Sequence, residues 1–259
     1  MIVTTPPKAY EPVGQCIYCG TVEGDLRREH ILPFGLGGNL VLPKASCQTC
    51  AKATGQIEQL CLRSLLGPTR IRLNLPTRRP KERPKVLSMI VVGADGAVET
   101  RSVPAPDYPM MLALYVFPPP RIITGAPDSQ IVDGALWVLS DQGTIDRQLG
   151  QQNAKAIRSP LIAAEHLLRM LAKIGHAYAV AQVGVNGFKP FLRELILQGT
   201  PDRSTFFIGG DLEVPAAEDA LHGLWFSYRW TARTRYLVVS VRLFAMLGSP
   251  LYHVVVGEG

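Results

Sequence analysis

The sequence predicts an α+β protein, in which a small zinc-stabilised module at the N-terminus precedes a larger α+β domain with an antiparallel sheet. Two Cys-x-x-Cys pairs lie within the first 50 residues. After residue 86, strand-like apolar runs alternate with helical patterns. With 259 residues, 47% of them hydrophobic and 19% charged, the chain can form one large or two small globular domains.

The N-terminal module is defined by two cysteine pairs, Cys16 with Cys19 and Cys47 with Cys50. In each pair a tight turn brings the two sulfurs together. Four thiolates complete a tetrahedral zinc site with no open coordination position, so we predict a structural zinc rather than a catalytic one. Four unrelated buried cysteines are the alternative. Cys61 lies outside both pairs and is expected to be a core residue on a helix.

The module is expected to occupy residues 1–75 and the larger domain residues 86–259. Between them, residues 76–85 have the sequence PTRRPKERPK, which is typical of an exposed, extended linker because it is rich in proline and charge. The apolar runs that follow flank Asp95-Gly96 and predict a β-hairpin.

The rest of the larger domain contains strand-like and helical runs. MLALYVF and ALWVLS predict two buried strands. A long helix is expected to begin at Ser159-Pro160, a favourable N-cap followed by a first-turn proline, and to end near Val183. FKPFLRELILQG predicts a second helix, and LWFSYRW, RYLVVSVRLFAML and LYHVVVG predict three antiparallel strands.

Four polar residues of the long helix recur at helical spacing and share one stripe: His166, Arg169, Lys173 and His176. Such a stripe is typical of a solvent-facing or interdomain surface, and contact with DNA, an anionic ligand or a partner is the alternative. Residues 86–259 show no catalytic motif. We expect them to serve target recognition, partner binding or dimerisation, as in a homodimer.

The loop between the cysteine pairs carries Glu29 and His30 ahead of the run ILPFGLGGN. A histidine titrates near neutral pH and can act as a general base, while a carboxylate can hold a divalent cation that polarises a phosphate. Adjacent strand residues point to opposite faces, so using both side chains needs a bend, which Pro33 and the glycines permit. Asn39 is placed to hydrogen-bond across the loop. Each residue alone is also typical of a surface loop or turn.

The motifs CIYC, EHILP, GGNL and CQTC, in this order, resemble those of the HNH endonucleases, also called ββα-metal or His-Me finger nucleases. The resemblance covers about residues 14–60. It implies a ββα-metal fold for the module and hydrolysis of DNA phosphodiester bonds. It also implies that His30 activates the attacking water, that Glu29 binds a catalytic Mg²⁺ or Mn²⁺ ion, and that Asn39 stabilises the loop carrying the base.

One position departs from the family pattern. The asparagine or histidine that commonly follows the last cysteine pair is Ala51 here, and alanine cannot bind a metal. Glu58 lies two helical turns further on, roughly on the face of Ala51, and is the candidate replacement ligand. The alternatives are that water fills the position or that the module has lost catalysis.

Positive charge is concentrated in the N-terminal third. Residues 1–85 hold 13 Lys and Arg against 6 Asp and Glu, whereas the remaining residues hold 14 against 15. This asymmetry predicts a module that faces a polyanion, and a solvated basic face or solubilising linker is the alternative. The residues expected to contact nucleic acid are Arg27, Arg28, Lys52, Arg70, Arg72, Arg78, Arg79, Lys81, Arg83 and Lys85.

The uncharged stretch at residues 174–188 is too short and too interrupted by glycine to span a bilayer, and the N-terminus lacks the apolar core of a signal peptide. We therefore expect a cytoplasmic protein without membrane association. The leading hypothesis is a metal-dependent, HNH-type DNA endonuclease with a structural zinc. The alternative is a non-catalytic, zinc-stabilised DNA-binding protein that has lost nuclease activity.

Overall fold

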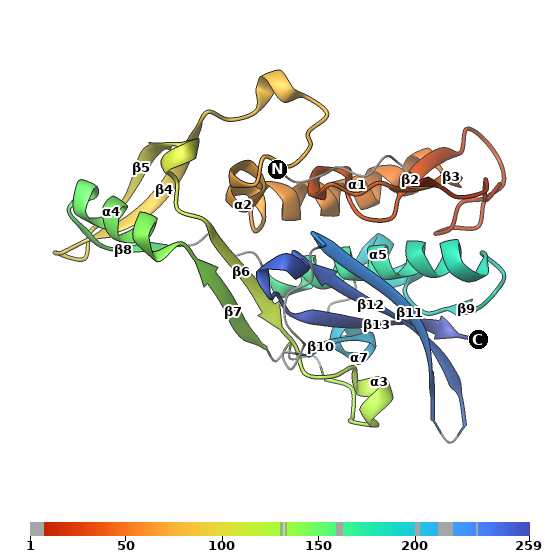
Figure 1. Cartoon of the computed structure of the whole chain (residues 1–259). Coiled ribbons are helices and arrows are strands. Elements are labelled where there is room, and N and C mark those ends of the chain that lie inside the picture. Colours follow the sequence, from red (N-terminus) through yellow and green to blue (C-terminus); the bar gives the residue numbers. More distant parts are fainter. Residues whose placement is uncertain are drawn as a thin grey trace.

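The computed structural model describes residues 8–129, 132, 134–158, 163–199, 203–211, 220–231 and 233–259. These residues form a mixed α+β fold with four separate sheets, which confirms the predicted α+β class. Figure 1 shows three layers. The N-terminal strands and helix α1 (Gln48–Arg63) form the upper layer, helix α5 (Ala164–Val183) lies in the middle, and the largest sheet lies below it.

The N-terminal part consists of a three-stranded sheet and a helix. Strand β2 (Arg27–His30) pairs antiparallel with β3 (Leu40–Ser46), and the short strand β1 (Lys8–Ala9) lies parallel to β3 on its other side. Helix α1 follows β3 directly because Cys47 caps it, with its sulfur accepting a hydrogen bond from the N–H of Cys50. The second cysteine pair therefore occupies the first turn of α1.

Between β2 and β3 the chain forms a compact loop around the short 3-10 helix η1 (Phe34–Leu36). Gly37 ends this helix with a φ of +86°, a left-handed conformation that glycine adopts without strain. Gly38 passes so close to Leu32 that a Cβ atom would lie 2.1 Å from the Leu32 carbonyl oxygen. The backbone of this loop therefore requires both glycines.

Helix α5 is the centre of the fold, because α1 packs on one side of it and a five-stranded sheet on the other. Gly175 permits the close approach to the sheet, since a Cβ atom there would lie 2.7 Å from Cγ1 of Val254. Cover on both sides explains why the helix is apolar around most of its circumference. The strand order of the sheet is β10 (Ile208–Asp211), β13 (Leu251–Glu258), β12 (Arg235–Leu243) and β11 (His222–Trp230), with β9 (Lys189–Pro190) also paired to β13.

Two smaller sheets extend from one side of these layers (Figure 1). Strands β4 (Val86–Gly93) and β5 (Val98–Pro104) form a hairpin joined by β8 (Ala154–Arg158), and β6 (Met111–Val116) pairs with β7 (Ala135–Ser140). The short helices are α2 (Gly67–Arg72), α3 (Arg121–Thr124), α4 (Gln142–Gln152), α6 (Arg193–Gln198), α7 (Ser204–Phe207), η2 (Pro80–Glu82), η3 (Ala105–Asp107) and η5 (Ala245–Leu247).

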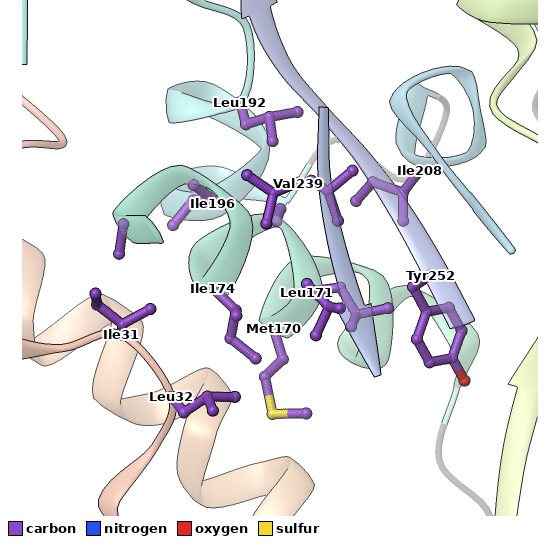
Figure 2. Packing of buried hydrophobic residues seen from close by; sticks show 14 of the residues in the cluster. Ile31, Leu32, Met170, Leu171, Ile174, Leu192, Ile196, Ile208, Val239 and Tyr252 are labelled. Carbon is purple, nitrogen blue, oxygen red and sulfur yellow. The ribbon is translucent and has the colours of Figure 1, made fainter. Parts of the chain in front are cut away.

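One apolar core runs through all three layers. Figure 2 shows some of its side chains, with Ile31 from the segment after β2, Met170 and Ile174 from α5, and Val239 from β12. Burying a side chain of this size contributes roughly 1.5–3 kcal/mol. The division of the chain around residues 76–85 stays a prediction, but the two parts share this core.

The structure confirms most of the predicted elements of the larger part. The hairpin turns at Asp95-Gly96, the three final strands are antiparallel, and the long helix ends at Val183. The second predicted helix is present in a shorter form, as α6. The predicted start of the long helix, Ser159-Pro160, lies outside the described residues.

Strand β7 corrects one prediction. Its run ALWVLS was expected to be buried, but Leu136 and Val138 are 45% and 58% exposed. The reason is that β7 pairs only with β6 in a two-stranded sheet, and the side chains of β6 are the ones that are buried. Residues 76–85 are mostly exposed, as predicted, and contain the turn η2. Within the described residues no helix combines the length and apolarity needed to cross a bilayer.

His222 joins the largest sheet to the loop between β2 and β3. Its Nδ1 accepts a hydrogen bond from the N–H of Phe244 (3.0 Å), and its Nε2–H donates to the carbonyl of Leu36 (2.7 Å). The neutral imidazole therefore uses both ring nitrogens. Burial lowers the pKa of His222 to about 4.

We predict that His222 makes the fold acid-sensitive between about pH 6.5 and about pH 4. An unfolded histidine takes up a proton with a pKa of about 6.5, whereas folded His222 does so only at about 4, so falling pH favours unfolding across this window. At about pH 5 the unfolding free energy is lower by about 2 kcal/mol for this reason. Urea titrations at about pH 7 and about pH 5 should show a smaller loss in His222→Gln than in wild type. Equal losses would contradict the prediction.

Candidate functional site

The four cysteines of the Cys-x-x-Cys pairs meet in one cluster, as their spacing predicts. The Sγ atoms of Cys16, Cys19, Cys47 and Cys50 all lie within 4.8 Å of one another, and those of Cys19 and Cys47 are 3.8 Å apart. Four sulfurs placed tetrahedrally at about 2.3 Å from a zinc ion lie about 3.8 Å apart. The donor set and its dimensions therefore suggest a structural zinc.

Two turns bring these sulfurs together. The N–H of Gly20 donates to the carbonyl of Cys16 (2.8 Å) and closes the turn around the first pair, while the second pair lies at the start of α1. Burial opposes ionisation of the Cys16 thiol, but backbone N–H groups of Cys19, Cys47 and Tyr18 outweigh it and lower its pKa to about 7. One sulfur is thus close to ionising at neutral pH, which favours cation binding.

Cys61 stands apart from the cluster, as predicted. It is fully buried in α1, and its thiol donates to the backbone carbonyl of His166 on α5 (3.4 Å). All five cysteines are free thiols rather than disulfides. Cys61 therefore contributes to the packing of α1 on α5.

Strand β2 separates Glu29 from His30. Glu29 is opposite Leu42 and His30 is opposite Val41, so the two side chains point to different faces of the sheet. Glu29 is 6% exposed, whereas His30 is half-buried and its ring lies edge-on to Phe34, with centroids 5.9 Å apart. Both residues line the same cleft, but Glu29 is almost fully buried there and His30 only half-buried.

Glu29 meets Glu58 of α1 at the ammonium group of Lys173, which comes from α5. The Nζ atom of Lys173 lies 2.7 Å from Oε1 of Glu29 and 2.7 Å from Oε1 of Glu58. It also donates to the backbone carbonyls of His30 and Ile31, and its side chain is 1% exposed. Burial favours the neutral amine, but the two carboxylates outweigh it and raise the pKa of Lys173, so the group is charged.

The residues around Lys173 do not fit the Mg²⁺ or Mn²⁺ ion that the resemblance implies. Glu29 and Glu58 are both paired with the ammonium group, and Ala51 offers no ligand atom. Within the described part of the chain, the cysteine cluster is the one group of three or more His, Cys, Asp or Glu ligand atoms close enough to hold a metal. The predicted metal-binding roles of Glu29 and Glu58 find no support in this arrangement.

His30 faces a cleft of about 1720 Å³, formed by β2, α1 and the segment that follows α2. The predicted nucleic-acid contacts that line it are Arg27, Arg28, Lys52, Arg70, Arg78, Arg79 and Arg83. Arg72, Lys81 and Lys85 lie elsewhere. Arg63, at the end of α1, also lines the cleft. Sequence reasoning missed it, although its place on the helix that follows the second cysteine pair was the available signal.

Several of these cations are engaged within the protein. Arg70 donates to the carbonyl oxygens of Gly35 (2.6 Å) and Leu62 (3.0 Å), and so holds the glycine-rich loop against α1. Arg79 forms an exposed ion pair with Glu82. The other engaged arginines are Arg72 and Arg83, which donate to backbone carbonyls.

Five exposed cations of the cleft are free. Within the part of the chain that the structure describes, no hydrogen bond or ion pair engages the side chains of Arg27, Arg28, Lys52, Arg63 and Arg78. Three of the four acidic residues that line the cleft are themselves ion-paired, so they do not neutralise these groups. The cleft therefore presents positive charge, which favours a polyanionic ligand.

The same charges act on His30. Burial lowers the pKa of its imidazole, and the positive charges of Lys173, Arg78 and Arg28 lower it further. The ring is therefore neutral at neutral pH and can accept a proton. Arg28 and Arg78 line the same cleft as His30.

Asn39 lies just before β3 and is not among the described residues that line the cleft. Its backbone carbonyl accepts a hydrogen bond from the N–H of Lys8 (2.8 Å), which joins β1 to β3. The role of its side chain in stabilising the loop stays a prediction.

The polar stripe of α5 is an internal surface. Beside Lys173, His176 donates from Nε2 to the carbonyl of Ile17 (2.8 Å), and burial lowers the pKa of His176 to about 4. Arg169 donates to the carbonyl of Leu195 in α6 (3.2 Å). Lys173 and His176 thus contact the N-terminal part of the chain, whereas the division into two domains stays a prediction.

We predict that the cysteine cluster holds about one zinc ion per chain and that the fold depends on it. Cys47→Ser removes one ligand while serine still caps α1, so this variant should lose its zinc and melt at least about 10 °C lower. Cys61→Ser is the matched control, because its hydroxyl can still donate to His166. Metal analysis and thermal melts measure both effects. Wild type carrying less than about half an equivalent of zinc would contradict the prediction.

Comparisons of this chain with protein-family models, with curated proteins and with solved structures give no match. Its function is therefore inferred from the cleft and the cysteine cluster themselves.

Proposed function

We propose that this protein binds DNA in the basic cleft and hydrolyses a phosphodiester bond there, with His30 as the general base. One observation carries the proposal: a neutral imidazole lies in a cleft that offers five free, exposed cations. The cations suit a phosphate backbone, and the imidazole suits the activation of water. The resemblance to HNH endonucleases selects DNA among polyanions.

The spacing of the free cations supports binding to several phosphates at once. Lys52 and Arg63 lie about 16 Å apart along the axis of α1, at about 1.5 Å per residue. Arg27 and Arg28 add charge from β2, and Arg78 adds charge from the segment after α2. Duplex DNA carries one negative charge per about 1.7 Å of its axis, so a surface of this length meets several phosphates.

Hydrolysis requires activation of a water molecule, stabilisation of charge on the phosphate and departure of a sugar oxygen. In the proposed reaction His30 accepts a proton from the water as its oxygen attacks phosphorus. Arg28 and Arg78 hold the non-bridging oxygens and stabilise the charge that develops on them. The bond from phosphorus to the leaving sugar oxygen then breaks, and that oxygen takes a proton from solvent.

The local fold supports the same proposal. A Cys-x-x-Cys turn precedes β2, His30 ends that strand, and α1 follows β3 directly. This is the order of strand, strand and helix that the resemblance implies. The tight loop at Gly37 and Gly38 connects the strand carrying the base to the strand that leads into α1.

A DNA-binding protein without nuclease activity is the second candidate. It is favoured by the ammonium group of Lys173, which engages both carboxylates expected to bind a catalytic metal. It is also favoured by Ala51, which replaces the expected third ligand. In this case the same cations bind DNA, and His30 is a residue of the binding surface.

For DNA binding, we predict that Arg28→Ala and Arg78→Ala each weaken affinity roughly 5- to 10-fold, because each removes a free cation from the cleft. Each should also reduce the slope of log affinity against log salt by about 1. Fluorescence anisotropy with a labelled duplex measures both quantities. Arg147→Ala is the matched control, because Arg147 is exposed on α4 and lies outside the cleft lining. Wild-type affinity in both cleft variants would argue against this binding site.

For hydrolysis, we predict that the zinc-loaded protein nicks a supercoiled plasmid and that His30→Ala lowers the rate at least about 100-fold. DNA affinity should change less than about threefold, because the neutral ring contributes no charge to binding. Gel assays measure the rate and anisotropy measures the affinity. Wild type that binds the plasmid but never nicks it would establish the second candidate. Equal nicking by His30→Ala would exclude His30 as the base.

A further inference from the structure

The ammonium group of Lys173 lies in a pocket of oxygen atoms. Oε1 of Glu29 and Oε1 of Glu58 are each 2.7 Å from Nζ, the carbonyl oxygen of Ile31 is 3.3 Å away, and the carbonyl of His30 also accepts a hydrogen bond. Carboxylate and carbonyl oxygens are the ligands that hard divalent cations prefer. The pocket is therefore built for a cation, and the chain supplies that cation itself.

The burial of Lys173 keeps its ammonium group in this pocket. Its side chain is 1% exposed, and it lies in the middle of α5, which packs against α1 on one side and the sheet on the other. The ammonium group cannot reach solvent unless these layers separate. Without it, Glu29 and Glu58 would face each other as like charges, the former almost fully buried.

We infer that Lys173 takes the place of a catalytic divalent ion in this chain, so that the cleft binds and cleaves DNA without Mg²⁺ or Mn²⁺. The part concerning cleavage rests on the proposed function, whereas the part concerning metal binding does not. Lys173 is a positioning residue, because it is too deeply buried to touch a substrate. Its hydrogen bond to the His30 carbonyl holds the backbone of the proposed base.

The direct test titrates Mn²⁺ into the zinc-loaded, full-length protein and follows the paramagnetic resonance signal of free Mn²⁺. Wild type and Glu58→Gln should bind the same number of Mn²⁺ ions, because Lys173 already engages the Glu58 carboxylate in wild type. Lys173→Met keeps an apolar stem of similar length but removes the charge, so it should gain about one Mn²⁺ site, bound at least about 10-fold more tightly than any wild-type site.

Two further variants serve as controls. The double variant Lys173→Met/Glu58→Gln should lose the gained site again, because it lacks one of the two carboxylates. Lys189→Met should behave as wild type, since Lys189 is exposed on β9, outside this pocket.

Either of two results of the titration would overturn the inference. Wild type could bind Mn²⁺ at a site that Glu58→Gln abolishes, or Lys173→Met could keep its zinc and circular dichroism spectrum yet gain no site. If Lys173→Met does not fold, the comparison of wild type with Glu58→Gln decides alone.

Nicking in metal-depleted buffer tests the part concerning cleavage. Zinc-loaded wild type should nick at rates that agree within about twofold with and without Mg²⁺. Stimulation by Mg²⁺ of about 10-fold or more would overturn the inference and leave the proposed function intact. Absence of nicking under every condition would overturn the proposed nuclease function, while the Mn²⁺ titration would still decide the metal question.

Discussion

The buried contact of Lys173 with Glu29 and Glu58 is the interaction on which the arrangement of the molecule depends, because it joins β2, α1 and α5. Buried ion pairs add little net stability, since the loss of hydration offsets the attraction. Breaking one is nevertheless strongly unfavourable, because an unpaired charge then stays buried. We therefore expect the contact to act mainly on register, because a shift of α5 along α1 would leave a buried charge unpaired.

The cysteine cluster and Lys173 hold the same helix at two points. Cys47 and Cys50 fix the first turn of α1, and Glu58 fixes the helix about two turns further along. Glu29 ties β2 to the second of these points, which opposes a shift of the strand that carries His30 against α1. On the proposed function, this double attachment holds the strand that carries the base in one orientation towards the substrate.

Contacts and elements formed by residues close together in the sequence were predictable, whereas contacts between side chains of distant segments were not. The Cys-x-x-Cys spacing implies a cluster because a turn brings residues three apart together, and apolar alternation identifies the final strands. Lys173 was assigned to the correct polar stripe, but no sequence pattern connects it to Glu29 or Glu58. Positive charge in the sequence likewise does not show which side chains bind a carbonyl oxygen within the protein. Arg70 binds two such carbonyls, whereas Arg63 is free among the described residues, and the sequence does not reveal this difference. The exposure of β7 depends on its place at a sheet edge, which an apolar run does not reveal.

Lys173 occupies the place inferred for a divalent ion, but a buried ammonium group cannot take over the catalytic roles of that ion. A metal ion contacts the phosphate and lowers the pKa of a bound water, whereas Lys173 is buried and touches only protein groups. On the proposed function, charge stabilisation therefore passes to Arg28 and Arg78, and activation of water depends on His30 alone. These arginines lower the pKa of the His30 imidazole while the cleft is empty. On the proposed function, a bound phosphate would neutralise part of their charge, so the imidazole would become a stronger base when the substrate is present.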